Sequence, residues 1–169
     1  MRDQAECLRN LVRQRESEDL HKSPLKEIKI YTVASGKGGV GKTNVVVNTA
    51  IALQKKGYRV MILDADLGLA NVDVVLGIYP KVTLRDVMFD GKKLRDAVVR
   101  GPGGIRIIPG GSGMLEMTKL NSNSQKALMN QFSEIDDIDI LLIDTGAGIS
   151  MNQLSFITFA QEVILVTTP

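Results

Sequence analysis

The sequence contains no tryptophan, one cysteine and one histidine among its 169 residues, and aromatic side chains make up 4% of it. A single thiol, Cys7, cannot form an internal disulfide or build a metal site by itself, so a disulfide scaffold and an iron–sulfur carrier are both excluded. No apolar run has the length of a membrane-spanning helix, and the charged N-terminus lacks the apolar segment of a signal peptide. These absences favour a cytoplasmic protein.

Charge of one sign is not in excess either. Lys and Arg number 21 and Asp and Glu number 19, mixed along the chain, which gives a formal net charge of +2. The chain has no basic stripe or tail of the kind that binds nucleic acid, so no direct nucleic-acid partner is expected. With 44% hydrophobic residues, 169 residues suffice for one sizeable core but are short for two full domains.

A glycine-rich stretch, residues 34–43 (ASGKGGVGKT), follows the apolar run Ile28–Val33, which is typical of a buried strand. From Gly36 it satisfies G-x-x-x-x-G-K-[ST], in which loop N–H groups surround phosphates, a lysine adds positive charge and a hydroxyl reaches Mg²⁺. The N-terminus of the helix that follows favours the same anion. The expected phosphate-binding residues are Gly36, Lys37, Gly38, Gly39, Val40, Gly41, Lys42, Thr43 and Asn44.

The same glycines also spell G-x-G-x-x-G, the pattern of a dinucleotide-binding oxidoreductase, and Asp64 follows near the spacing of its acidic residue. That fold requires neither Lys42-Thr43 nor a later strand that ends in an aspartate, and this sequence has both, the strand at Ile140–Asp144. The phosphate-loop interpretation is therefore favoured, with the dinucleotide fold and a glycine-rich turn without function as the alternatives.

Apolar periodicity predicts the rest of the domain. A helix over Asn44–Lys56 and a strand over Tyr58–Asp66 complete a βαβ unit, which builds a parallel sheet with ligands at the carboxyl ends of its strands. We therefore expect Asp64 and Asp66 at such an end. The further predicted elements are a small helix at Leu84–Met88, a strand at Ile105–Ile108, a helix marked by Ala127, Leu128, Phe132 and Ile135, a strand at Ile138–Ile143 that delivers Asp144, and a strand at Val163–Val166.

The two ends of the chain carry further expectations. A last strand without a neighbour would leave an exposed apolar edge, so we expect the sequence to be part of a longer chain, truncated at its C-terminus. Residues 1–23 are expected to form an amphipathic helix over Asp3–Glu18 and a polar linker, ahead of an α/β domain at 24–169. Such a short helix must dock on its own domain or on a partner.

Lys37 gives the loop a second lysine, and the pattern K-G-G-x-x-G-K-[ST] resembles the deviant Walker A box of the MinD/ParA family of dimeric ATPases. Residues 63–73 (LDADLGLANVD) and 142–148 (LIDTGAG) resemble that family's second aspartate motif and its Walker B and switch region. The resemblance covers residues 28–169. It implies a P-loop NTPase fold of the SIMIBI type, with a mainly parallel sheet flanked by helices, and Mg²⁺-dependent ATP hydrolysis.

The resemblance also implies roles for single residues. Lys42 and the loop amides hold the phosphates, Lys37 reaches the nucleotide of a second chain, and Asp66 orients the attacking water. ATP-bound chains are expected to form a homodimer that returns to monomers with ADP. The metal-site residues implied are Thr43, Asp144 and Asp64, and Gly146 lets the switch backbone approach the γ-phosphate.

Within this family, residues 101–104 (GPGG), 109–113 (PGGSG) and 144–150 (DTGAGIS) are similar to the regulators of flagellar number, the FlhG group, also called FleN or YlxH. Residues 3–9 (DQAECLR) resemble the D-Q-A-x-x-L-R motif by which FlhG proteins stimulate the SRP-type GTPase FlhF. The implied partner-binding residues are Asp3, Gln4, Ala5, Leu8 and Arg9.

The same resemblance implies a wider setting. Flagellar basal-body proteins or a transcriptional regulator are further candidate partners. Reversible location at the inner membrane or the cell pole would need a C-terminal amphipathic helix beyond Pro169, where the adenine-binding segment would also lie. Another positioning ATPase, for the division site or for plasmid partition, is the alternative within the family, and the motif at residues 3–9 argues against it.

Overall fold

The computed structural model describes residues 28–66, 72–111, 127–128, 130–132, 135–148, 156–157 and 160–168. These residues contain one six-stranded sheet, whose strands in spatial order are β3 (Val99–Arg100), β4 (Arg106–Ile108), β2 (Val60–Ala65), β5 (Ile140–Ala147), β1 (Lys29–Ser35) and β6 (Glu162–Leu165). The helices are α2 (Lys42–Lys55), α3 (Val72–Leu76) and α4 (Leu84–Phe89), with short 3-10 helices η1 (Leu94–Ala97) and η2 (Pro102–Gly104). Residues 127–128 and 130–132 are also helical.

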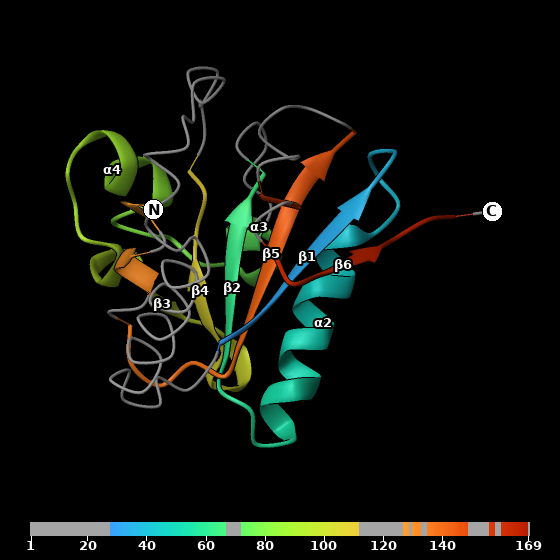
Figure 1. The fold of residues 1–169 in the computed structure, drawn as a ribbon, viewed down its shortest axis with the longest axis horizontal. Coiled ribbons are helices and arrows are strands. Elements are labelled where there is room, and N and C mark those ends of the chain that lie inside the picture. The colour runs from blue at the N-terminus through green and yellow to red at the C-terminus, as the bar shows by residue number, and fades with distance from the viewer. Residues whose placement is uncertain are drawn as a thin grey trace, which may run out of the picture.

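All neighbouring strands of the sheet run parallel except the edge strand β3, which is antiparallel to β4. In Figure 1 the arrowheads of β1, β2 and β5 point to the same edge of the sheet. The predicted mainly parallel α/β sheet is therefore confirmed. The two-residue strand β3 was not predicted, because so short a segment shows no alternation of apolar and polar side chains.

The sheet is buried on both faces because successive side chains of a strand point to opposite sides. On β2, Met61 and Leu63 belong to the apolar cluster that contains Leu84 of α4. Ile62, between them, belongs to the cluster that contains Val46 of α2. Helices thus cover both faces of the sheet, as the resemblance implies. The central strands are therefore apolar along nearly their whole length.

Two aspartates lie inside strands, where the sequence predicted them at strand ends. The strand predicted to stop at Ile143 continues to Ala147, so Asp144 lies in the middle of β5. Asp64 lies within β2, and only Asp66 follows that strand. The reason is pairing, since β5 continues alongside β2 to Thr145 and, after a register shift, alongside β1 to Ala147, with Asp144 opposite both Val33 and Asp64. The helix expected at residues 3–18 lies outside the described residues.

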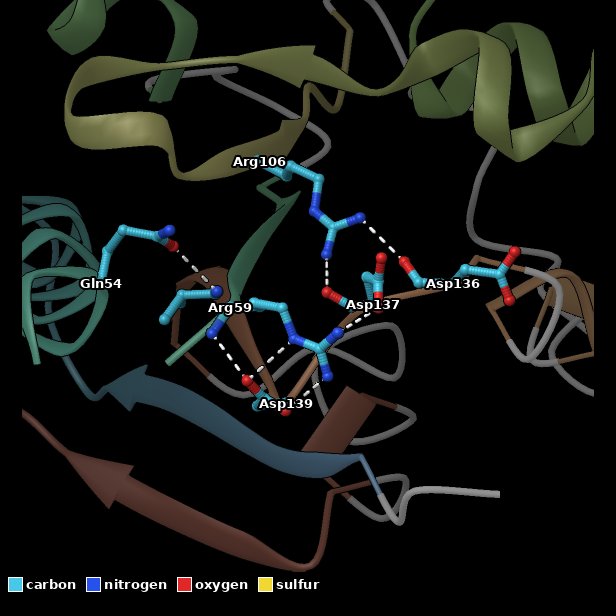
Figure 2. A network of polar contacts seen from close by, with 7 residues as sticks. Gln54, Arg59, Arg106, Asp136, Asp137 and Asp139 are labelled. Carbon is cyan, nitrogen blue, oxygen red and sulfur yellow. Dashed lines mark hydrogen bonds and ion pairs between the residues drawn. The ribbon is translucent and has the colours of Figure 1, made fainter. Parts of the chain in front are cut away.

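The opposite edge of the sheet carries a network of polar contacts that joins the amino ends of β2, β4 and β5 (Figure 2). Arg59 donates to the carboxylate of Asp139 from its backbone N at 2.8 Å, from Nε at 3.1 Å and from Nη2 at 2.9 Å, and it also pairs with Asp137. Arg106 donates to the carbonyl oxygen of Asp136 at 2.9 Å and to that of Asp137. Bidentate, charge-assisted bonds of this kind fix the register of these strands. They thereby help to place the carboxyl ends of the strands side by side at the other end of the sheet.

The strand β6 forms the other edge of the sheet and pairs with β1. Its apolar side chains Val163, Ile164 and Leu165 are exposed by 47%, 38% and 67%. This is the exposed apolar edge that the sequence led us to expect. Across the ranges that the structure describes, no helix is both long enough and apolar enough to span a membrane.

Candidate functional site

The predicted phosphate loop joins β1 to α2 at the carboxyl edge of the sheet. Gly39 and Gly41 have φ angles of 75° and 85°, in the left-handed region that glycine adopts without strain, and they turn the loop back over the strand. Gly41 is also the N-cap of α2, where no side chain caps the helix and no acidic residue occupies the first turn. The first amides of α2 are therefore available to an anion, and the helix dipole favours it.

A buried ion pair lies beneath this loop. Nζ of Lys42 is 2.5 Å from Oδ1 of Asp144, and the two side chains are 8% and 0% exposed. Lys42 starts α2, and Asp144 comes from the strand that pairs with β1 directly under the loop. Without a nucleotide, Asp144 compensates the charge of the lysine, so a phosphate oxygen that enters the loop has a positioned ammonium group to bind.

The second carboxylate oxygen of Asp144, Oδ2, is buried and has no hydrogen-bond partner among the described residues. Burial raises the pKa of Asp144, and the hydrogen bond and charge of Lys42 oppose this. The Thr43 hydroxyl lies close enough to lower the pKa as well, although it does not reach good hydrogen-bond geometry with Oδ2. Since buried polar oxygens are normally paired, Oδ2 is an acceptor suited to a cation-bound water.

Asp64 is fully buried beside this pair, opposite Asp144 in the register of β2 and β5. Its Oδ1 accepts from the backbone N of Asp66 at 3.1 Å and its Oδ2 from that of Val72 at 3.1 Å. The pKa of Asp64 is nevertheless raised from 3.8 to about 7, mainly by burial and also by the charges of Asp144 and Asp66, against the two hydrogen bonds. The three carboxyl groups are thus close enough to repel one another when ionised.

A magnesium ion fits these residues as part of a nucleotide complex. Within the described part of the chain, no group of three or more His, Cys, Asp and Glu side chains could hold a metal alone. Mg²⁺ generally keeps several waters and combines one or two protein ligands with phosphate oxygens. Three features suit a cation of that kind: Oδ2 of Asp144, which no described residue pairs, the repulsion among the carboxylates, and the position of Thr43 in the first turn of α2.

The other predicted residues lie at the same edge of the sheet. Lys37 is exposed in the loop, Asp66 is half-buried directly after β2, and Gly146 is buried in β5. Gly36 to Asn44 together form the loop and the first turn of α2. The predicted partner-binding residues Asp3, Gln4, Ala5, Leu8 and Arg9 lie outside the described residues.

Two hydroxyl groups hold the backbone of the site in place. Neither of them was identified from the sequence. Thr145 Oγ1 donates to the carbonyl oxygen of Val33 at 2.9 Å, which fastens the end of β5 to β1. Ser35 Oγ donates to the carbonyl oxygen of Lys37 at 3.0 Å and shapes the first turn of the loop. Both residues lie inside the motifs at 34–43 and 142–148, but a motif does not show which of its hydroxyls serve the backbone.

Known proteins have similar sequences, and solved structures have a similar fold. The sequence model of the ParA family, described as NUBPL iron-transfer P-loop NTPase, matches residues 27–169. The antiactivator FleN of Pseudomonas aeruginosa is 53% identical over 140 residues, which cover 82% of this chain and 50% of that protein. The flagellum site-determining protein YlxH of Helicobacter pylori is 37% identical over 145 residues, which cover 83% of this chain and 48% of that protein.

A solved structure shows the same fold. The septum site-determining protein MinD of Pyrococcus horikoshii, complexed with Mg-ADP, has a TM-score of 0.73 and 34% identity, over 85% of this chain and 59% of that chain. The match to a P-loop NTPase family favours the phosphate-loop interpretation over the dinucleotide one. The chain spans about half the length of the curated relatives it matches.

Proposed function

The chain belongs to the ParA family of P-loop NTPases, and we propose from this premise that it binds ATP with Mg²⁺ and hydrolyses it. The observation that carries the proposal is the Lys42–Asp144 pair, with 2.5 Å between Nζ and Oδ1, buried beneath the uncapped N-terminus of α2. It joins a phosphate-binding lysine to a carboxylate whose second oxygen has no hydrogen-bond partner within the described part of the chain. The similar MinD structure, which holds Mg-ADP, supports the choice of ligand.

In this proposal the residues of the chain act through position and charge. Lys42 exchanges Asp144 for phosphate oxygens, which the first amides of α2 also bind. Thr43 would hold the magnesium ion directly, and Asp144 would hold its waters, with help from Asp64. When bound, the ion neutralises charge that develops on the transferred phosphoryl group. Asp66, next to this edge and half-buried, accepts a hydrogen bond from the attacking water and orients it.

Asp66→Asn is expected to lower kcat for ATP hydrolysis by about a hundredfold or more, the usual contribution of a residue that orients or deprotonates the nucleophile. ATP affinity should change by less than about threefold, because the phosphates are held by the loop and by Lys42. Single-turnover hydrolysis and equilibrium binding, measured on the same samples, separate the two quantities. The matched control is Asp96→Asn, which changes an exposed aspartate of η1, just before the edge strand β3, which β4 and β2 separate from β5 and β1. Equal losses of affinity and kcat would contradict the assigned role.

We further propose that two ATP-bound chains pair through this edge as a homodimer and separate with ADP. Lys37 supports this, because it is exposed in the loop while Lys42 is buried on Asp144. An exposed ammonium group in this loop is placed to reach a phosphate held by a second chain. The molar mass in solution should double with a non-hydrolysable ATP analogue and stay monomeric with ADP. The same mass with both nucleotides would overturn this part of the proposal.

A role in control of flagellar number is the second function that we propose. The motif at residues 3–9 and the identity to FleN and YlxH support it, and the SRP-type GTPase FlhF is the proposed partner. Flagellar basal-body proteins or a transcriptional regulator, and reversible recruitment to the membrane or pole, belong to the same proposal. A positioning ATPase of the MinD or partition kind is the alternative. Iron transfer, which the family's description names, is not proposed for this chain, because the sequence contains a single thiol, Cys7.

A peptide spanning residues 1–20 should stimulate GTP turnover by FlhF, and the same peptide with Gln4→Ala should not. The helix must act on a partner or dock on its own domain, and the peptide isolates the first possibility. The measurement is steady-state GTP hydrolysis by purified FlhF. If neither peptide has an effect, or both have the same effect, the flagellar assignment fails and the chain is a ParA-type ATPase of another pathway.

A further inference from the structure

Residues 109–111, here named the β4 strap, leave β4 at the carboxyl edge of the sheet and are all buried. The strand β4 pairs in parallel with β2, with Ile108 opposite Leu63, so the strap passes directly beside Asp64. The glycines of this motif have no place in the hydrolysis proposed above. Their contacts nevertheless reach the residues that it uses.

Gly110 touches Asp64 from the side. A Cβ at Gly110 would lie 2.8 Å from the backbone oxygen of Asp64 and 3.6 Å from its carboxyl carbon. Real Cβ atoms do not approach a backbone oxygen so closely, so any side chain here would displace either the strap or the end of β2. The position therefore requires glycine for close approach of two backbones.

The strap is held from its other side by the first turn of α4. The carbonyl oxygens of Pro109 and Gly110 accept from the backbone N of Leu84 at 2.7 Å and of Arg85 at 3.2 Å. These bonds satisfy two of the amides that a helix start leaves unpaired. A strap fixed in this way cannot move away from Asp64 without breaking them.

Thr83 closes the same contact. Gly111 has a φ of 90°, and a Cβ on it would lie 2.7 Å from Oγ1 of Thr83. Asp86 holds Thr83 in turn through a capping box, accepting from its backbone N at 2.7 Å and from Oγ1 at 2.9 Å. A side chain added at Gly110 therefore displaces Asp64, because Thr83 blocks movement of the β4 strap to the other side.

Asp64 transmits such a displacement to Asp66. Its carboxylate accepts from the backbone N of Asp66 and of Val72, so it holds together the two ends of the segment that carries Asp66. We propose that Gly110 is a positioning residue for ATP hydrolysis, which keeps the end of β2, and through Asp64 the orientation of Asp66, in the active arrangement. The inference rests on the proposed function for its kinetic consequence alone.

Gly110→Ala is expected to lower kcat for ATP hydrolysis by about tenfold or more and to leave ATP affinity within about threefold. The affinity is spared because the strap borders β2 and α4, whereas the phosphate loop joins β1 and α2. The control is Gly101→Ala, whose Cβ would meet Ile107 Cδ1, the movable end of a side chain, at 2.5 Å at the other end of β4. Both changes crowd the core, but only the first presses on Asp64.

Amide hydrogen exchange at Val72 gives a second readout that needs no nucleotide. Its N–H is hydrogen-bonded to Asp64, so Gly110→Ala should speed its exchange by about tenfold relative to Gly101→Ala. Thr83→Ala, which removes the hydroxyl behind Gly111, leaves room on that side of the strap, so adding it to Gly110→Ala should reduce the increase in exchange. Equal exchange at Val72 in the two glycine variants would overturn the positioning role. Faster exchange without any ATP turnover in the unsubstituted chain would uphold it and refute the proposed function instead.

Discussion

Lys42→Met is expected to abolish ATP binding and to lower the free energy of unfolding of the nucleotide-free chain by about 3 kcal/mol, the usual cost of removing one partner of a buried ion pair. Methionine keeps an unbranched side chain as far as the ε position and lacks the ammonium group, so the change removes chiefly the charged end of the side chain. Asp144 is 0% exposed, and its Oδ2 already lacks a partner among the described residues. Without the ammonium group the whole carboxyl group is buried unpaired, and its pKa rises because burial then acts without the opposing lysine.

A double variant separates the two consequences of this change. Lys42→Met with Asp144→Leu replaces the pair by apolar side chains and should recover most of the lost stability, because a buried pair is often no better than well-packed apolar groups. It should not recover ATP binding, because the ammonium group that binds the phosphates and the carboxylate that binds the waters of the metal ion are both absent. Denaturant unfolding and equilibrium ATP binding measure the two effects. Stability that stays low in the double variant, or binding that returns, would contradict the assigned role of the pair.

The stability of the nucleotide-free chain should also depend on pH through Asp64. Its folded-state pKa of about 7 lies above the value of 3.8 expected for the unfolded chain. Between these values the folded state binds more protons at Asp64, so the contribution of this group to stability is greatest below about pH 4 and is lost as pH rises toward 7. At about 1.4 kcal/mol for each unit of pKa, this one group accounts for a loss of about 4 kcal/mol across the interval.

Asp64→Asn should remove that slope. The amide cannot ionise, and its oxygen still accepts one of the bonds from Asp66 and Val72, so the variant should be about 1 kcal/mol less stable than the chain at pH 4 and should lack the loss that the chain shows toward pH 7. Other carboxylates act in the opposite sense; the backbone N–H of Thr83, for example, lowers the pKa of Asp86. The quantity to compare is therefore the difference in unfolding free energy between the chain and the variant from pH 4 to pH 8. A constant difference would show that Asp64 is not the titrating group.

The sequence predicted the elements that local patterns define. The loop at 34–43, the helix α2 and the strands around it follow from glycine spacing and apolar periodicity, and all of them are present. The small helix α4 was also predicted, and its bounds extend the expected segment by one residue to Phe89. The short helix α3 was not predicted, because Val72–Leu76 is too brief to show a helical repeat.

Contacts between distant segments were beyond local patterns. Lys42 and Asp144 are separated by 102 positions, and the resemblance implied their roles but not that they pair when no nucleotide is bound. The contact of Gly110 with Asp64 depends on the order of β4 beside β2, which only the folded sheet reveals. The bonds from Asp64 to Asp66 and Val72 belong to the same class, since nothing in a run of apolar residues shows which buried acid will organise the next loop.

The most direct test is a calorimetric titration of the purified chain with Mg-ATP and, separately, with NAD and NADH. The central claim is that the loop over Lys42 and Asp144 is a binding site for a nucleoside triphosphate. It predicts saturable binding of one Mg-ATP per chain, weaker binding when EDTA removes the metal, and no measurable binding of either dinucleotide. Dinucleotide binding in place of ATP, or ATP binding that is the same in Lys42→Met, would contradict it.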